Sequence, residues 1–171
     1  SVKGNASGLG LNLVTANANA TLNTYVTGAY GDITINGVNS VGAQTYSGKN
    51  LTFTSGSTLS QGALSATSYG NVLINSDVTA TSTITLTSNA STGNTVSGTG
   101  TLNTGSGSGS GLKLVGNNTS YTLSNANNVS NLAATLSGSG SLTFKNATAS
   151  FFRCSGCKNL HLRPFVHLPW A

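Results

Sequence analysis

The sequence predicts an all-β chain wound as a parallel β-solenoid of about seven irregular coils. Three observations support this prediction. Ser, Thr, Asn and Gly make up 93 of the 171 residues, and only 5% of the residues are charged. The apolar residues of the first 150 positions fall largely into short runs that alternate with polar residues. These runs recur at a loose period of about 20 residues, the length of one solenoid coil with two or three short strands.

Six runs hold apolar residues at alternate positions, with a polar residue between them in every run except 71–75, where Leu73 stands between Val72 and Ile74. Successive side chains of a strand point to opposite faces, so each run places two apolar groups on one face and mostly Thr or Asn on the other. Gly, Asn or Ser flank the runs, and these residues suit turns because they accept positive φ or form local hydrogen bonds. The six predicted strands cover residues 32–36, 50–54, 71–75, 83–87, 111–115 and 141–145.

Other segments connect these strands. Asn36-Gly37 fits a tight hairpin turn and equally fits the corner of a coil. Residues 105–111 read GSGSGSG, which lacks the Lys-Ser/Thr of a phosphate-binding loop and is expected to be a flexible insertion between coils. No segment shows a helical apolar stripe of useful length, and the nearest to one is 128–136.

The spacing of the runs sets the expected coil length. At about 20 residues a coil, residues 1–149 make about seven coils, and stacking at ~4.8 Å gives a rod of roughly 35 Å. The supporting intervals are those from Ile33 to Leu51, from Leu51 to Val72, from Ile84 to Leu102 and from Tyr121 to Leu142. The much shorter step from Val72 to Ile84 breaks the pattern.

A β-sandwich is the alternative fold, because many short strands suit it as well. A sandwich usually buries large side chains across a core about 10 Å thick. Residues 1–149 offer only Phe53, Phe144 and five tyrosines as large aromatic groups. The small, repeated aliphatic side chains therefore favour the narrower solenoid.

The composition changes sharply near residue 150. Residues 1–149 are predicted to form the solenoid fragment. Residues 150–171 hold both Cys, both His, both Pro and the only Trp, but just three Ser, Thr, Asn or Gly after Ser150. This tail is expected to be foreign to the fold, a frameshift or truncation artefact, and the alternative is a genuine capping segment, since stacked repeats need atypical ends.

Residues 111–147 carry a recognisable pattern. Tyr-Thr-Leu stands at 121–123, Asn-Val at 128–129 with Leu-Ala-Ala at 132–134, and Ser-Gly-Ser-Leu-Thr-Phe at 139–144. This pattern resembles the repeats of filamentous-haemagglutinin-like bacterial adhesins of the two-partner secretion route, and autotransporter passenger domains are similar. The resemblance extends over most of residues 8–148. It implies a right-handed parallel β-helix from a much longer exoprotein, secreted to the bacterial cell surface for adhesion, biofilm formation or cell–cell contact.

The tail contains the one set of residues with metal-ligating chemistry. Cys154, Cys157, His161 and His167 follow the spacing C-x2-C-x3-H-x5-H and are a candidate zinc set. The gap from Cys157 to His161 is far shorter than the ~12 residues of a zinc finger. We expect no cofactor and no designed role for these residues; zinc and a Cys154–Cys157 disulfide are the alternatives.

The scarcity of acids argues against an enzyme. Asp32 and Asp77 are the only acidic residues, and they stand far apart in the chain. A site built on paired carboxylates, or one that binds calcium, needs several acids close together. We therefore expect no catalytic residues and assign both aspartates to turns.

Two functions remain open. The first is an adhesive or structural rod that contacts host-cell or matrix glycans or proteins and associates with itself through open coil ends. The second is a Thr-rich binding module of the ice-binding or glycan-binding type, suggested by Thr-x-Thr at 52–54 and by the threonines of 81–87. A nucleic-acid partner is not expected, because the net charge of +5 comes mainly from the tail and forms no basic face in the sequence. No apolar run reaches the ~18 residues of a membrane span.

Overall fold

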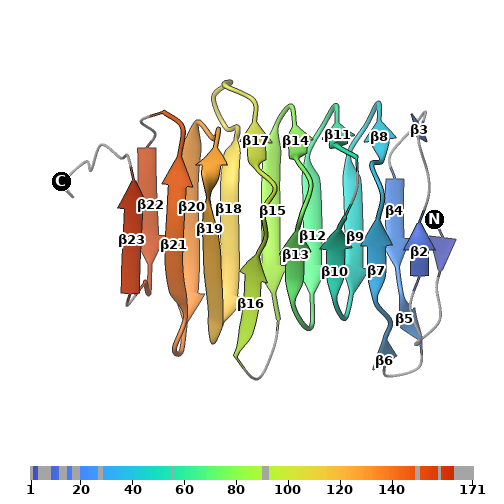
Figure 1. Cartoon of the computed structure of the whole chain (residues 1–171), viewed down its shortest axis with the longest axis horizontal. Coiled ribbons are helices and arrows are strands. Elements are labelled where there is room, and N and C mark those ends of the chain that lie inside the picture. The colour runs from blue at the N-terminus through green and yellow to red at the C-terminus, as the bar shows by residue number, and fades with distance from the viewer. Residues whose placement is uncertain are drawn as a thin grey trace.

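The chain folds as a parallel β-solenoid, as Figure 1 shows for the computed structural model. The structure describes residues 2–3, 9–11, 15–16, 20–26, 29–54, 56–89, 93–148, 151–157 and 159–163, and none of these residues is helical. Each coil contributes one strand to each of two long sheets, here named sheet I and sheet II, and five coils add a strand to sheet III. All pairings within these three sheets are parallel, so the β-sandwich alternative is wrong.

The strands of each sheet follow one another in chain order along the rod. Sheet I contains β1 (Val2–Lys3), β4 (Ala20–Asn23), β9 (Gln44–Gly48), β12 (Leu64–Ser68), β15 (Thr83–Ser88), β18 (Gly111–Asn117), β20 (Asn131–Ser137) and β22 (Phe151–Ser155). Sheet II contains β2 (Leu9–Leu11), β7 (Ile33–Ile35), β10 (Leu51–Phe53), β13 (Val72–Ile74), β16 (Asn94–Ser97), β19 (Thr119–Asn127), β21 (Ser141–Asn146) and β23 (Asn159–Arg163). Sheet III contains β3 (Thr15–Ala16), β8 (Asn39–Ser40), β11 (Thr58–Ser60), β14 (Val78–Ala80) and β17 (Leu102–Thr104).

Seven turns of chain separate the eight strands of sheet I, which agrees with the predicted number of coils. All six predicted strands are present, as β7, β10, β13, β15, β18 and β21. Residues 128–136 are not helical, because Asn131–Ser137 is a strand in which Leu132, Ala134 and Leu136 are buried. Gly37, with a φ of 66°, lies at the corner between β7 and β8, so Asn36-Gly37 is a corner of a coil and not a hairpin.

Three of the four predicted repeat intervals are register pairs. Ile33 lies opposite Leu51, Leu51 opposite Val72, and Tyr121 opposite Leu142. The prediction that Ile84 and Leu102 occupy equivalent positions of successive coils is wrong, because Ile84 belongs to sheet I and Leu102 to sheet III. The short step from Val72 to Ile84 arises for the same reason: these residues lie in sheets II and I, and the partner that follows Val72 is Val96.

The core is a set of stacked columns inside the coils. In sheet II one buried column contains Ile33, Leu51, Val72, Val96 and Tyr121, each at most 1% exposed. Such columns form because every coil repeats the same inward positions, so that each side chain packs on its counterpart in the next coil. A single coil has too little apolar surface to fold alone, and stacking supplies the burial.

Tyr46 and Tyr121 are buried in the core, and the hydroxyl of each has a hydrogen-bond partner. The Tyr46 hydroxyl donates to Gln44 Oε1 at 2.5 Å, and Gln44 Nε2 donates to the carbonyls of Val38 and Leu59 at 3.1 and 2.7 Å. The Tyr121 hydroxyl lies 2.7 Å from the carbonyl oxygen of Val115. Burial raises the pKa of both phenols far above 10, because the charged form would lose its hydration.

Two insertions interrupt the regular coils. An antiparallel hairpin of β5 (Tyr25–Val26) and β6 (Ala29–Tyr30) lies between β4 and β7. The Tyr30 ring stacks on Tyr69 with centroids 3.9 Å apart. The other insertion is the predicted Gly/Ser loop between β17 and β18, which lengthens its coil before Leu114 pairs with Leu86.

The solenoid continues into the compositionally distinct tail. β22 pairs with β20 and β23 pairs with β21, both parallel and in register. Phe152, Cys154 and Leu162 are half-buried and pack against the core, because their alternation matches the inward columns. Residues 151–157 and 159–163 therefore form a last coil, while the origin of the tail stays a prediction.

Candidate functional site

Two outer surfaces carry groups that can recognise a ligand. The first is the hydroxyl face, defined as the outward side chains of β4, β9, β12 and β15 that lie in register with one another across sheet I. These strands present two such side chains each in direct register. The eight side chains are Thr21, Asn23, Thr45, Ser47, Ser65, Thr67, Thr85 and Thr87.

The register of these strands fixes the spacing of the hydroxyl face. Neighbouring strands lie about 4.8 Å apart, and alternate residues along a strand lie roughly 6.6 Å apart. The side chains of Thr45, Ser65, Thr67 and Thr85 form no hydrogen bond within the part of the chain that the structure describes, so their hydroxyls are available. Lys113 and Ala133 occupy the equivalent positions of β18 and β20, so the face ends at β15.

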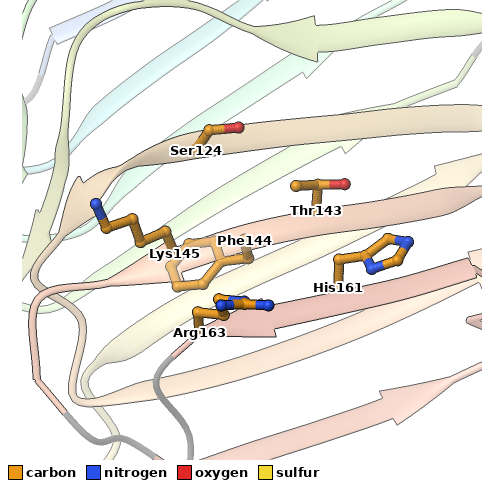
Figure 2. A pocket seen from close by; sticks show the side chains of 6 residues that line it. All are labelled: Ser124, Thr143, Phe144, Lys145, His161 and Arg163. Atoms are coloured by element: carbon orange, nitrogen blue, oxygen red, sulfur yellow. The ribbon is translucent and has the colours of Figure 1, made fainter.

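The second surface is the basic pocket, on the outer face of sheet II near the end of the rod. It has a volume of about 180 Å³ and comes from three neighbouring strands, β19, β21 and β23 (Figure 2). Its residues are Ser124, Thr143, Phe144, Lys145, His161 and Arg163.

The strand register explains why these side chains meet. Lys145 lies directly opposite Arg163, and Thr143 lies directly opposite His161. Residues two apart on a strand share a face, so all four side chains project outward together. Lys145, His161 and Arg163 are exposed, whereas Phe144 on the alternate face is buried. The pocket is thus a basic surface patch above the apolar core.

The predicted zinc set is only partly brought together. Cys154 and Cys157 form a disulfide with their Cα atoms 6.1 Å apart, which is the alternative pairing that the sequence left open. Zinc would need both cysteines as free thiolates. His161 belongs to the basic pocket, and His167 lies outside the described residues.

Asp32 and Asp77 lie at different corners of the solenoid. Asp32 Oδ1 accepts hydrogen bonds from the backbone N–H and the Nδ2 of Asn50, at 3.1 and 2.9 Å. Asp77 Oδ1 accepts from the backbone N–H and the hydroxyl of Thr101, at 3.0 and 2.7 Å. Asp32 lies just before β7 of sheet II, and Asp77 lies just before β14 of sheet III. Each carboxylate therefore links its own coil to the next one by hydrogen bonds.

Asparagines extend the ladder that Asp32 begins. Asn50 Oδ1 accepts from the backbone N–H of Asn71 at 2.9 Å, and Asn71 Oδ1 accepts from that of Thr95 at 2.9 Å. Each side chain therefore takes up a backbone donor that the corner would otherwise leave unpaired. Asn50 and Asn71 therefore have a structural role at the corners of the coils.

The described residues hold no group of three or more His, Cys, Asp and Glu side chains that could bind a metal ion. Among the same residues no helix is long and apolar enough to cross a membrane. Neither the protein-family models, nor the curated proteins, nor the solved structures contain a match to this chain.

The sequence did not single out Lys145 and Arg163. Only the pairing of β21 with β23 places these two side chains opposite each other, although they are distant in the chain. The available signal was the alternation of residues 159–163, in which Leu160 and Leu162 continue the inward columns and His161 and Arg163 fall on the outer face.

Proposed function

We propose that this chain is a non-catalytic structural and adhesive segment of a large exoprotein secreted to the bacterial cell surface. The observation that carries the proposal is the stack of equivalent coils, with apolar columns inside and a wall of Thr, Ser and Asn outside. A solenoid of this kind makes a stiff spacer whose length grows with the number of coils. The resemblance of residues 111–147 to adhesin repeats adds the surface location and the adhesive role.

The partners that we propose are glycans or proteins of host cells and matrix, and other copies of the chain. A polar wall with few charges recognises such partners through hydrogen bonds. The labelled chain is expected to bind cultured cells or immobilised matrix glycoproteins saturably, with competition from the unlabelled chain. Binding that does not saturate would contradict the adhesive role.

Self-association would use the open edges of the last coil, because β22 and β23 end their sheets in the described structure. Phe151→Lys places a charge at this edge, and Val41→Lys is the matched control, since both side chains are 59% exposed. Sedimentation velocity over a concentration series should show oligomers that Phe151→Lys weakens and Val41→Lys leaves unchanged. A chain that stays monomeric at high concentration would contradict association through the ends.

The hydroxyl face favours a second candidate function, an ice-binding or glycan-binding module. Its eight in-register side chains over four strands form a regularly spaced array of hydrogen-bonding groups. Thermal hysteresis and binding to insoluble polysaccharides would test it, with Thr85→Lys on the face and Thr122→Lys on sheet II as the control. Equal effects of the two substitutions, or neither activity in the parent chain, would exclude this function.

A further inference from the structure

We propose that the basic pocket binds a phosphate monoester or inorganic phosphate, held by Lys145 and Arg163. The two residues occupy directly opposed positions on β21 and β23, with their side chains on the same outer face. Like charges at such positions destabilise a sheet, because the Cβ atoms of opposed residues lie only about 5 Å apart. A bound anion would remove this repulsion.

No acidic side chain compensates the two cations. The chain has two acids, and both are hydrogen-bonded at corners of other coils, Asp32 to Asn50 and Asp77 to Thr101. Across the described ranges of the chain, neither Lys145 nor Arg163 takes part in an ion pair. The pocket therefore keeps its positive charge for a ligand.

The donors define the ligand chemistry. An Arg guanidinium binds phosphate or carboxylate through two parallel hydrogen bonds, and a Lys ammonium adds a point charge. The hydroxyls of Ser124 and Thr143 add neutral donors on the same surface (Figure 2). The two fixed positive charges match a phosphate monoester, which carries about −1.5 to −2 at pH 7, better than a singly charged carboxylate.

Titration of the isotope-labelled full chain with inorganic phosphate, followed by backbone amide NMR shifts, tests the proposal. At constant ionic strength we expect saturable shifts at Ser124, Thr143 and Lys145 and at β23, with a dissociation constant on the order of millimolar. Acetate should bind several-fold more weakly. Shifts that do not saturate, or that spread evenly over all basic residues, would overturn the proposal.

Variants of the two cations give the decisive comparison. Lys145→Gln and Arg163→Gln should each weaken phosphate binding by about threefold to fivefold, as expected for exposed charge pairs. Lys113→Gln is the matched control: Lys113 is an exposed lysine on β18, opposite Thr85 and Ala133 and not opposite a cation. The shifts of buried Leu142 and Phe144 report whether each variant keeps the fold. Equal weakening by the control would overturn the assignment.

Lipid vesicles separate the two sources of a phosphate monoester. Phosphatidic acid displays this group at a membrane surface, whereas phosphatidylcholine vesicles are the neutral reference. If the chain binds phosphatidic acid vesicles and both Lys145→Gln and Arg163→Gln abolish this binding, the ligand is a lipid headgroup. If the chain binds inorganic phosphate but not the vesicles, the ligand is a free phosphate. Failure of both would overturn the phosphate site, while the adhesive function would stand on its own binding tests.

Discussion

Thr58 is an unusual member of its column in sheet III. Register places it opposite Val78, and it is fully buried. Its hydroxyl finds no hydrogen-bond partner within the described residues. Burying a hydroxyl without a partner costs free energy that an apolar side chain of similar shape avoids.

The substitution Thr58→Val should therefore raise the free energy of unfolding by about 1 kcal/mol. Urea unfolding followed by circular dichroism measures the change. Thr52→Val is the control, because Thr52 lies on the outer face of β10 and should change stability little. A lower unfolding midpoint for Thr58→Val would mean that the hydroxyl has a partner in solution.

Tyr46 and Tyr121 make stability depend on alkaline pH. Burial raises the pKa of both phenols in the folded chain, whereas the unfolded chain has the ordinary tyrosine pKa of about 10. The unfolded state therefore loses protons first, and the contribution to stability that is complete below pH 10 falls as the pH rises. We expect a loss of about 1.4 kcal/mol per pH unit for each phenol above that value.

Denaturant titrations at several pH values above 10 measure how the free energy of unfolding depends on pH. The substitution Tyr46→Phe should make this dependence shallower, because one buried phenol is removed. The variant also leaves Gln44 Oε1 without its donor at neutral pH, which costs about 1–3 kcal/mol. Tyr69→Phe is the control, since Tyr69 is 38% exposed. An unchanged pH slope in Tyr46→Phe would show that the buried phenol titrates normally.

Asn127 shapes the end of β19, where the register with β21 shifts after Leu123. The side chain is 1% exposed. Its Oδ1 accepts from the backbone N–H of Leu102 at 2.8 Å, and its Nδ2 donates to the carbonyl of Lys145 at 2.8 Å. One side chain thus bonds the coils on both sides of its own.

Replacing it by alanine, Asn127→Ala, should lower the free energy of unfolding by about 2–4 kcal/mol, because the buried N–H of Leu102 and the partly buried carbonyl of Lys145 lose this partner. Chemical denaturation measures this change. Asn117→Ala, at an exposed position of β18, should cost less than about 1 kcal/mol. Equal costs at the two positions would contradict the bridging role of Asn127.

The strands that the sequence predicted are those whose inward positions hold large aliphatic residues. β10 has Leu51 and Phe53 at its inward positions, and β13 has Val72 and Ile74, so both strands were located correctly. β12 was not predicted, because its inward positions hold Leu64, Ala66 and Ser68, and only the packed neighbours make the last two suitable for a core. Small inward residues carry no hydrophobic signal of their own.

The outer surfaces were harder to predict than the columns. The hydroxyl face depends on Ser47 and Ser65 as much as on threonines, so a search for Thr-x-Thr detects only part of it. The basic pocket depends on which strand follows β21 in sheet II. Alternation in the sequence predicts the face of the sheet on which a side chain lies. It does not predict which residue lies opposite on the next strand, because the coils vary in length and the register is known only from the structure.

At the scale of the whole molecule, a solenoid is held together by contacts between adjacent coils. The coil that contains β13 has a neighbour on each side, whereas among the described residues β22 and β23 pair with one coil only. Side chains of the last coil remain partly exposed, including Leu160 at 40%, although their counterparts in the preceding coil are buried. Local opening should therefore be easier in this coil than in the middle of the rod.

The Cys154–Cys157 disulfide spans the end of β22 and the corner that follows it. It closes a short loop, so it restricts the unfolded chain little and acts mainly on the order of the last coil. Amide hydrogen exchange should be faster in β22 and β23 than in β12 and β13, and reduction of the disulfide should accelerate exchange only in that last coil. The paired variant Cys154→Ser with Cys157→Ser should reproduce the reduced state without a reducing agent. If β12 and β13 lost protection in parallel, the coils would unfold as one cooperative unit. The claim that contacts between adjacent coils let the last coil open independently would then be wrong.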